Sequence, residues 1–268
     1  MNSETTSPQY WDHTFEQGKE SLRLDAWRKY MTSVYSRLTV AWFKQGSNSP
    51  ILKTDLFEEA CTEYSLMGEM GAEGIGFDHS LQIARAAKNK LRTKEASCRV
   101  LVCDLRNLPF QTGCIEKILS PSSLDHFRVQ QDIDKSLQEL GRVLSPGGVL
   151  ILALDNPHNP VVWLRNHLPF AWLNRVGLVP YYVGPTCTVP EANAKLQAAG
   201  FEVTDCTAVA HAPRAPAIWL VMIAEMLKSK RLGEWLSRTF GWWDVLQRWP
   251  LRYRTGYYIA LRAVRCPN

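Results

Sequence analysis

The sequence has no glycine over a long stretch near its start, and it has no paired cysteines. No glycine occurs between Gly46 and Gly68, and the seven cysteines are scattered without a CxxC pair. That spacing argues against a zinc ribbon, and an odd number of cysteines argues against a secreted disulfide framework. We therefore predict a protein of the reducing cytoplasm with no metal site.

Long apolar runs are scarce as well, and we expect no leader sequence. The first twenty residues are polar and acidic, without the basic start or the apolar stretch of a signal peptide. The apolar run at 215–224 (APAIWLVMIA) is about half of the roughly 20 residues that a spanning helix needs. We expect no transmembrane helix.

Acidic residues are scarce in the last part of the chain. The net charge is +5, but residues 212–268 carry ten Lys or Arg against three Asp or Glu, whereas the first 211 residues carry 21 against 23. The basic character therefore belongs to the C-terminal fifth.

What the sequence does contain is an alternation of apolar strands and helices. Apolar residues between Leu24 and Leu38 recur at helical spacing, and a very apolar strand is expected at 149–154 (VLILAL). Continuous apolar strands separated by helices are typical of a parallel sheet covered on both faces. Further strands are expected at 51–55, 74–78, 98–103, 115–120, 201–209 and 257–264.

The predicted fold class is therefore α/β, with a doubly wound and mostly parallel seven-stranded sheet. Residues 1–48 are expected to form an N-terminal helical lid and residues 49–268 the main domain. Two insertions, which we call the first cap (156–189) and the second cap (212–255), interrupt the alternation. In such folds, ligands bind at the carboxyl ends of the strands.

Asp78 ends an expected strand within GIGFDHS, and His79 and Ser80 begin a helix. A carboxylate in that place can accept hydrogen bonds from two neighbouring ribose hydroxyls. It can equally cap the helix. On this stretch alone, both interpretations stay open.

A second set of motifs is more specific. Asp104 follows a strand and precedes LPF, the next strand ends at Ser120, and RVLSPGG at 142–148 leads into the apolar strand. Each could be ordinary turn chemistry, but their order and separations together are hard to obtain by chance.

These motifs resemble those of class I S-adenosylmethionine-dependent methyltransferases, in the branch with D-x-x-x-LPF, L-x-H and RVL-x-PGG. The resemblance implies that Asp78 and the adjoining His79 lie at the ribose and that Asp104 and the Leu105 amide read the adenine edge. It also implies that Ser120 and the loop after it face the methionine end. An N-terminal aromatic segment, here Tyr10 and Trp11, often folds over the cofactor in this branch, although ordinary helix packing would explain these two residues equally well.

The departure from the family is the stretch ILKTDLFEEA at 51–60, where an acidic residue and G-x-G-x-G are expected. Leu56 and Phe57 would fill the cleft if they pointed into it, which would leave a degenerate binding or scaffold protein. Alternatively, the turn takes another path, with Asp55 accepting the methionine ammonium and Lys53 or a helix N-terminus offsetting the carboxylate. We favour altered binding.

Two histidines are the leading candidates for a base that takes a proton from an oxygen or nitrogen acceptor. His126 follows the fourth expected strand, and His211 ends the sixth beside the second cap. Asp155 ends the fifth strand and is also expected to face the cleft. A lone histidine is more often structural than catalytic.

The second cap contains half of the ten tryptophans, interleaved with Lys and Arg. It could contact a membrane surface, wall off a bulky acceptor, or simply pack onto the domain. Nucleic acid is a poorer fit, because the rest of the chain is slightly acidic. We expect a small-molecule or lipid-like acceptor, a cytoplasmic location with possible peripheral membrane contact, and no nucleic-acid partner. The oligomeric state stays open.

Overall fold

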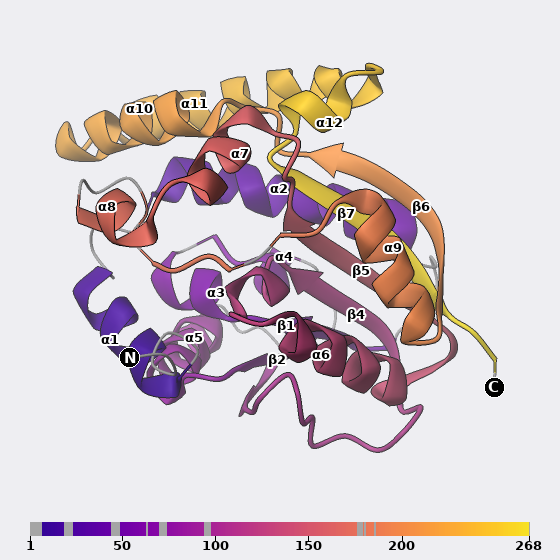
Figure 1. Cartoon of the computed structure of the whole chain (residues 1–268). Helices are drawn as coiled ribbons and strands as arrows, with labels where there is room; N and C mark the ends of the chain where they lie inside the picture. The colour runs from indigo at the N-terminus through magenta and orange to yellow at the C-terminus, as the bar shows by residue number, and fades with distance from the viewer. Residues whose placement is uncertain are drawn as a thin grey trace.

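The computed structural model describes residues 7–18, 24–43, 49–62, 64–69, 74–93, 98–175, 179, 181–184 and 186–267. Within them a seven-stranded sheet forms the centre of the molecule (Figure 1). The strand order is β3-β2-β1-β4-β5-β7-β6, and only β7 is antiparallel to its neighbours. The strands are β1 (Ile51–Thr54), β2 (Gly74–Asp78), β3 (Cys98–Val102), β4 (Ile115–Pro121), β5 (Leu144–Asp155), β6 (Phe201–Val209) and β7 (Tyr258–Arg265). The predicted mostly parallel seven-stranded sheet is confirmed.

Strand β5 shows why the sheet needs cover on both sides. Val149, Ile151 and Ala153 belong to one apolar core, and Leu150 and Leu152 belong to another. Successive side chains of a strand point to opposite faces, so an uninterrupted apolar strand buries both. The first core is closed by α2 (Asp25–Trp42), α10 (Arg214–Met226) and α11 (Lys230–Trp242), and the second by α6 (Gln130–Val143) and α9 (Val189–Ala198).

The SPGG motif lies inside β5 rather than between two elements. The strand begins at Leu144, pairs with Ile115 of β4, shifts its register, and resumes pairing at Val149. Gly147 has a φ of 74°, which a residue without a Cβ adopts without strain. The expected turn is therefore a bulge in a longer strand.

The N-terminal segment divides into two helices with different environments. Helix α1 (Pro8–Gly18) lies against α5 (Leu81–Thr93), because Asp12 accepts hydrogen bonds from Ser80 Oγ and from the Gln82 amide. Helix α2 instead buries Trp27 and Tyr30 against Phe240 of α11. The expectation of one lid over 1–48 is therefore corrected, because α2 is a core helix.

The two caps lie beyond the carboxyl ends of β4 and β5 (Figure 1). The first cap contributes α7 (Pro160–His167) and α8 (Phe170–Arg175), and the second contributes α10, α11, η3 (Trp243–Arg248) and α12 (Arg252–Thr255). The remaining short helices are α3 (Phe57–Cys61), α4 (Leu66–Glu69) and η2 (Leu124–His126). No helix in the described ranges is both long and apolar enough to cross a membrane.

Candidate active site

The turn after β1 has a lysine as its internal support. Lys53 is 1% exposed, and its ammonium donates to Glu59 Oε2 at 2.8 Å and to the backbone carbonyl of Asp55. Burial lowers the pKa of Lys53, but the nearby charges of Glu59 and Asp55 outweigh it, and the pKa is raised overall. Lys53 therefore holds the turn and does not face a ligand, contrary to the expectation that it offsets the methionine carboxylate.

The bulky side chain of Leu56 points away from the strand ends. Leu56 is fully buried with Ala60 and Ile83, and a Cβ at Gly76 of β2 would lie 2.5 Å from its Cδ2. Glycine in β2 therefore makes room for the side chain of Leu56. The interpretation in which the side chain of Leu56 fills the cleft is therefore wrong, because this side chain lies in the core.

The carboxylates of Asp55 and Asp78 lie close to each other where β1 and β2 end. Asp78 accepts hydrogen bonds from the Leu56 amide at 3.1 Å and the Ser80 amide at 2.8 Å. Burial, followed by the charge of Asp55, raises the pKa of Asp78 to about 7. Asp78 thus caps α5 and orders the turn at the same time, while its partly accessible carboxylate retains further lone pairs for a ligand.

Asp104 lies beyond β3 and is held by an arginine. The guanidinium of Arg106 pairs with its carboxylate, with Nη2 to Oδ2 at 2.6 Å, and His79 Nε2 lies 3.9 Å from the same oxygen. Burial alone would raise the pKa of Asp104, but the hydrogen bonds from Arg106 lower it overall. Leu105, the next residue, is 7% exposed. His79, which the resemblance places at the ribose with Asp78, therefore lies beside Asp104.

Ser120 differs from the expectation. Its side chain is fully buried, and its hydroxyl accepts a hydrogen bond from Thr54 Oγ1 at 2.9 Å between β1 and β4. Ser123 Oγ, in the loop that follows, donates to the Thr54 carbonyl at 2.8 Å. The side chain of Ser120 therefore links β1 to β4 inside the sheet, and the role of the following loop stays a prediction.

His126 lies in an aromatic cluster at the end of β4. Its ring centroid is 4.8 Å from that of Trp11 and 5.6 Å from that of Tyr181, and Nδ1 lies 3.2 Å from the Tyr182 carbonyl. Burial lowers the pKa of His126. A neutral ring that donates from Nδ1 to a carbonyl leaves Nε2 unprotonated, which is the form a general base needs.

Trp11 brings α1 to this cluster. Its ring packs edge-on against Phe57 of α3, with the centroids 6.4 Å apart, and the Tyr10 hydroxyl accepts a hydrogen bond from the Tyr182 amide at 2.9 Å. These contacts join α1, the turn after β1 and the first cap. Of the aromatic pair singled out in the sequence, Trp11 therefore lies against His126, and Tyr10 packs against Trp11.

His211 occupies a different environment. It is 3% exposed, with Nε2 at 3.0 Å from the Ala208 carbonyl and Nδ1 at 2.8 Å from Thr255 Oγ1. Both ring nitrogens therefore have protein partners, and the ring ties β6 to α12. This geometry does not support the predicted catalytic role, because no nitrogen is left to take a proton.

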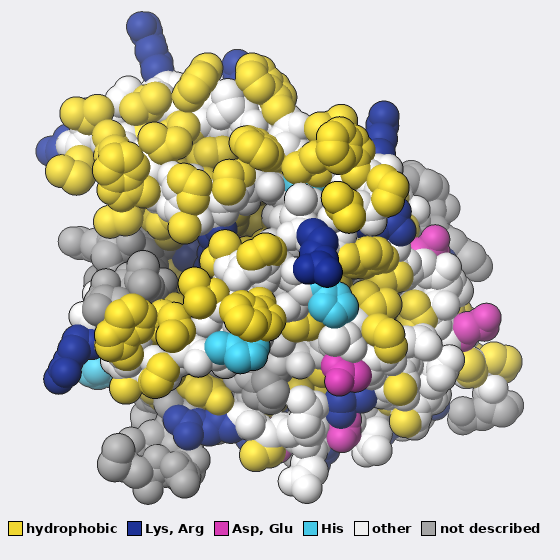
Figure 2. Space-filling view, turned by 45° about the horizontal axis from the view of Figure 1, so that its top comes forward, with side chains coloured by type: hydrophobic (Ala, Val, Ile, Leu, Met, Phe, Trp, Pro, Cys, Tyr) yellow, Lys and Arg dark blue, Asp and Glu magenta, His cyan; other side chains and the backbone are white. Residues whose placement is uncertain are grey.

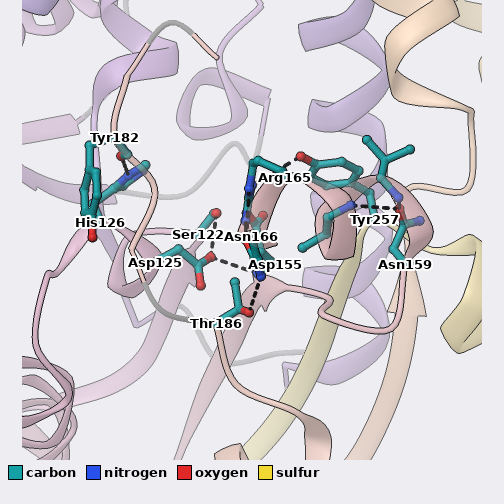
Figure 3. Close-up of polar contacts among 12 residues, drawn as sticks. Ser122, Asp125, His126, Asp155, Asn159, Arg165, Asn166, Tyr182, Thr186 and Tyr257 are labelled. Carbon is teal, nitrogen blue, oxygen red and sulfur yellow. Dashed lines mark hydrogen bonds and ion pairs between the residues drawn. The ribbon is translucent and has the colours of Figure 1, made fainter. Parts of the chain in front are cut away.

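A network of charged residues, shown in Figure 3, lies at the ends of β4 and β5. Asp125 accepts hydrogen bonds from Ser122 Oγ at 2.8 Å and from the Asp155 amide at 2.9 Å. Burial, followed by the charge of Asp155, raises the pKa of Asp125 to about 8. Arg165 of α7 pairs with Asp155 and reaches the Tyr257 hydroxyl at 3.4 Å.

Sequence reasoning singled out Asp155 and missed its partners. Arg165 and Tyr257 lie in a cap helix and next to a strand end, in segments without a recognisable motif. Arg214, the first residue of α10, places its guanidinium 4.5 Å from the centre of the Tyr257 ring. The only sequence signal for Arg165 and Arg214 is that each lies in a cap, and each cap begins shortly after the end of a strand.

Comparison with known proteins gives a family match over part of the chain. Residues 60–152 match the family described as "Methyltransferase domain". The strand order and the strand-end carboxylates agree with that match. The match and the fold together indicate a methyltransferase domain over residues 60–152.

Among known proteins, the chain is similar to Mus musculus "Probable tRNA methyltransferase 9B", with 32% identity over 78 residues. That match covers 29% of this chain and 16% of the relative, so the chain matches only a small part of that protein. It is also 30% identical over 151 residues to the demethylmenaquinone methyltransferase of Thermus thermophilus, covering 50% and 65% of the two chains.

Among solved structures, the chain resembles one from the complex of the Haloferax volcanii Trm112 methyltransferase activator and a methyltransferase. The TM-score is 0.59 at 15% identity, with 99% of each chain covered. At this identity the likeness shows the fold alone.

Proposed function

We propose that this chain transfers the methyl group of S-adenosylmethionine to a small or amphipathic acceptor and leaves S-adenosylhomocysteine. One observation carries the proposal: the turn after β1 keeps Leu56 beneath β2, while Asp55, Asp78 and Asp104 follow adjacent strands at one edge of the sheet. The missing glycines are therefore compatible with an open cofactor site.

The residues present fit the cofactor in three places. Asp78 would accept hydrogen bonds from the ribose hydroxyls. Asp104, the Leu105 amide and His79 would contact the adenine, with the Asp104 carboxylate bound to both Arg106 and the adenine. Asp55 would accept from the methionine ammonium, with the loop after Ser120 beside it. When bound, the cofactor supplies a sulfonium methyl group to an in-line nucleophile.

His126 is the residue we assign to the proton. Its Nε2 would take the proton from an acceptor hydroxyl or amine as the nucleophile forms its new bond to carbon. Trp11 and Tyr181 pack against the ring and against each other, and would exclude water and align the acceptor. His211 has no such position.

An anionic group on the acceptor would suit Arg214. Its guanidinium contacts the Tyr257 ring. None of the carboxylates in the described ranges lies within ion-pair distance of Arg214, and Asp155 is already paired with Arg165. A cation flanked by tyrosine rings favours an acceptor with an acidic group beside an apolar or aromatic body. This feature supports the amphipathic class over a neutral metabolite.

Isothermal titration with S-adenosylmethionine and S-adenosylhomocysteine tests the proposal. We expect saturable binding to the wild-type chain and at least tenfold weaker binding to Asp78→Ala, about the effect of losing one charged hydrogen-bond acceptor. Asp134→Ala, which removes an exposed carboxylate, is the matched control. No binding at millimolar ligand would instead support a non-catalytic binding or scaffold role for the fold.

A further inference from the structure

Helix α10 turns an entirely apolar face toward solvent. Its exposed positions are Ala215, Pro216, Trp219, Leu220, Met222 and Met226. Trp219 is 65% exposed and Met226 is 82% exposed, whereas Ala217, Val221 and Ala224 face the core. A helix on the surface of a protein ordinarily carries polar residues on its outer side.

The first cap extends the same kind of surface. Trp163 and Leu164 of α7 are 54% and 53% exposed, and Trp172 of α8 is 51% exposed. Figure 2 shows hydrophobic side chains gathered over the end of the molecule formed by the two caps. We call the exposed apolar residues of α7, α8 and α10 the apolar face.

Exposed basic residues lie at the C-terminal ends of α8 and α10, the helices that carry most of the apolar face. Lys228, Lys230 and Arg231 are exposed where α10 leads into α11, and Arg175 is exposed at the end of α8. Residues 156–190 contain no Asp or Glu at all. An apolar helical face with a cationic border and several tryptophans has the composition of a surface that lies in the headgroup region of a bilayer.

The charge decides between a membrane and a protein partner. Protein interfaces are depleted in lysine and form around a few buried anchors, whereas this face combines scattered tryptophans with lysines at its edge. The helices are also too short to span a bilayer, which leaves docking along its surface.

We propose that the apolar face docks the molecule onto membranes that contain anionic lipids, with Lys228, Lys230 and Arg231 meeting the headgroups. Arg214 lies at the inner end of α10, so the helix that would rest on the membrane also carries a cation beside Tyr257. An amphipathic acceptor could then pass from the bilayer to the strand ends. Docking itself does not depend on methyl transfer and can be measured without it.

Vesicle flotation tests the proposal with the full chain. Vesicles of phosphatidylcholine alone are compared with an equimolar mixture of phosphatidylcholine and phosphatidylglycerol, and we expect recovery with the anionic vesicles. Trp219→Glu combined with Met226→Glu should lower the affinity for the vesicles by about tenfold or more. The variant loses two apolar side chains that enter the bilayer and gains two charges that are costly to place there. Val40→Glu with Val102→Glu changes two exposed apolar residues elsewhere and is the matched control.

The cationic border is tested separately. Replacing Lys228, Lys230 and Arg231 by alanine should lower affinity about fivefold per charge, while replacing the exposed Arg85, Lys88 and Arg92 of α5 should leave it unchanged. Circular dichroism melting checks that every variant folds.

Three results would overturn the proposal. They are absence of flotation with either vesicle, equal loss in the control variants, and a concentration-dependent dimer that covers the apolar face and is broken by Trp219→Glu. A gel-shift with tRNA that is abolished by the cationic variant, in the absence of vesicle binding, would assign the surface to nucleic acid instead.

Discussion

The ammonium of Lys53 lies 2.8 Å from the carboxylate of Glu59, and neither side chain is more than 2% exposed. The second carboxylate oxygen, Glu59 Oε1, has no hydrogen-bond partner among the described residues. This buried pair joins the end of β1 to α3 across the turn. A charged pair thus orders a turn for which glycines were expected.

Lys53→Met should be strongly destabilising, because it leaves the buried Glu59 carboxylate without a counter-charge. Breaking one side of a buried pair costs about 3–5 kcal/mol. The double variant Lys53→Met with Glu59→Leu should recover much of that loss, since two apolar side chains of similar volume need no partner. Urea unfolding at neutral pH measures both free energies of unfolding.

The partly exposed pair of Lys195 and Asp134, 2.6 Å apart, provides the control for this prediction. Its loss through Lys195→Met should cost less than about 1 kcal/mol. If Lys53→Met were no more destabilising than Lys195→Met, the buried pair would not be what holds the turn.

Leu56 and Phe57 are adjacent but should respond differently to truncation. Leu56→Ala should lower the free energy of unfolding by about 2–5 kcal/mol because it opens a cavity beneath β2, with little change in cofactor affinity. Phe57→Ala removes a half-buried ring that contacts Trp11 and Tyr181, so we expect the smaller loss of stability and the larger loss of cofactor affinity. Titration calorimetry and urea unfolding of both variants make the comparison. The reverse pattern would mean that Leu56 lines the cleft.

The sheet was predictable from the sequence because segments rich in apolar residues alternate with segments of helical pattern. The expected strands at 74–78 and 201–209 coincide with β2 and β6, and the end of each strand fixes which carboxylates meet at one edge. That is why Asp78 and Asp104 could be placed at strand ends, while their roles toward a cofactor rest on the family resemblance and stay predictions.

The parts that could not be predicted depend on long-range contacts. The segment 8–45 has one helical pattern, yet α1 packs on α5 and α2 packs under α11, and periodicity does not say which partner a helix meets. Likewise, Lys53 could not be assigned to the interior, because its partner Glu59 becomes visible only once the turn is built. Arg165 and Arg214 reach the strand ends from cap helices, where no motif marks them.

Carboxylates whose pKa is raised in the folded state make stability depend on pH. Burial raises the pKa of Asp78 to about 7 and that of Asp125 to about 8. The folded state therefore binds these protons more tightly than the unfolded state, and the free energy of unfolding should fall as pH rises from about 4 to about 8. Asp104, whose pKa is lowered, acts in the opposite sense but only below that window.

Asp125→Asn tests this dependence, because an amide oxygen can still accept from Ser122 or the Asp155 amide and carries no charge. The decrease in stability between about pH 5 and pH 8 should become smaller in the variant, and at about pH 8 the variant should be the more stable protein. Urea unfolding at both pH values measures the slope, with the exposed Asp134→Asn as control. A slope unchanged from wild type would show that Asp125 is already ionised across this range.

The two histidines should separate into a catalytic and a structural residue. His126→Asn retains an amide nitrogen that can donate to the Tyr182 carbonyl but lacks the base at Nε2, so the rate of tritiated methyl transfer into a lipid extract should fall by about 10²–10⁴. The acid limb of the pH–rate profile should disappear with it, and stability should change little. His211→Ala should instead lower the free energy of unfolding, because it removes the hydrogen bonds of the ring to the Ala208 carbonyl and to Thr255 Oγ1, with kcat within a few-fold of wild type. A large loss of kcat in His211→Ala at unchanged stability would reverse the assignment.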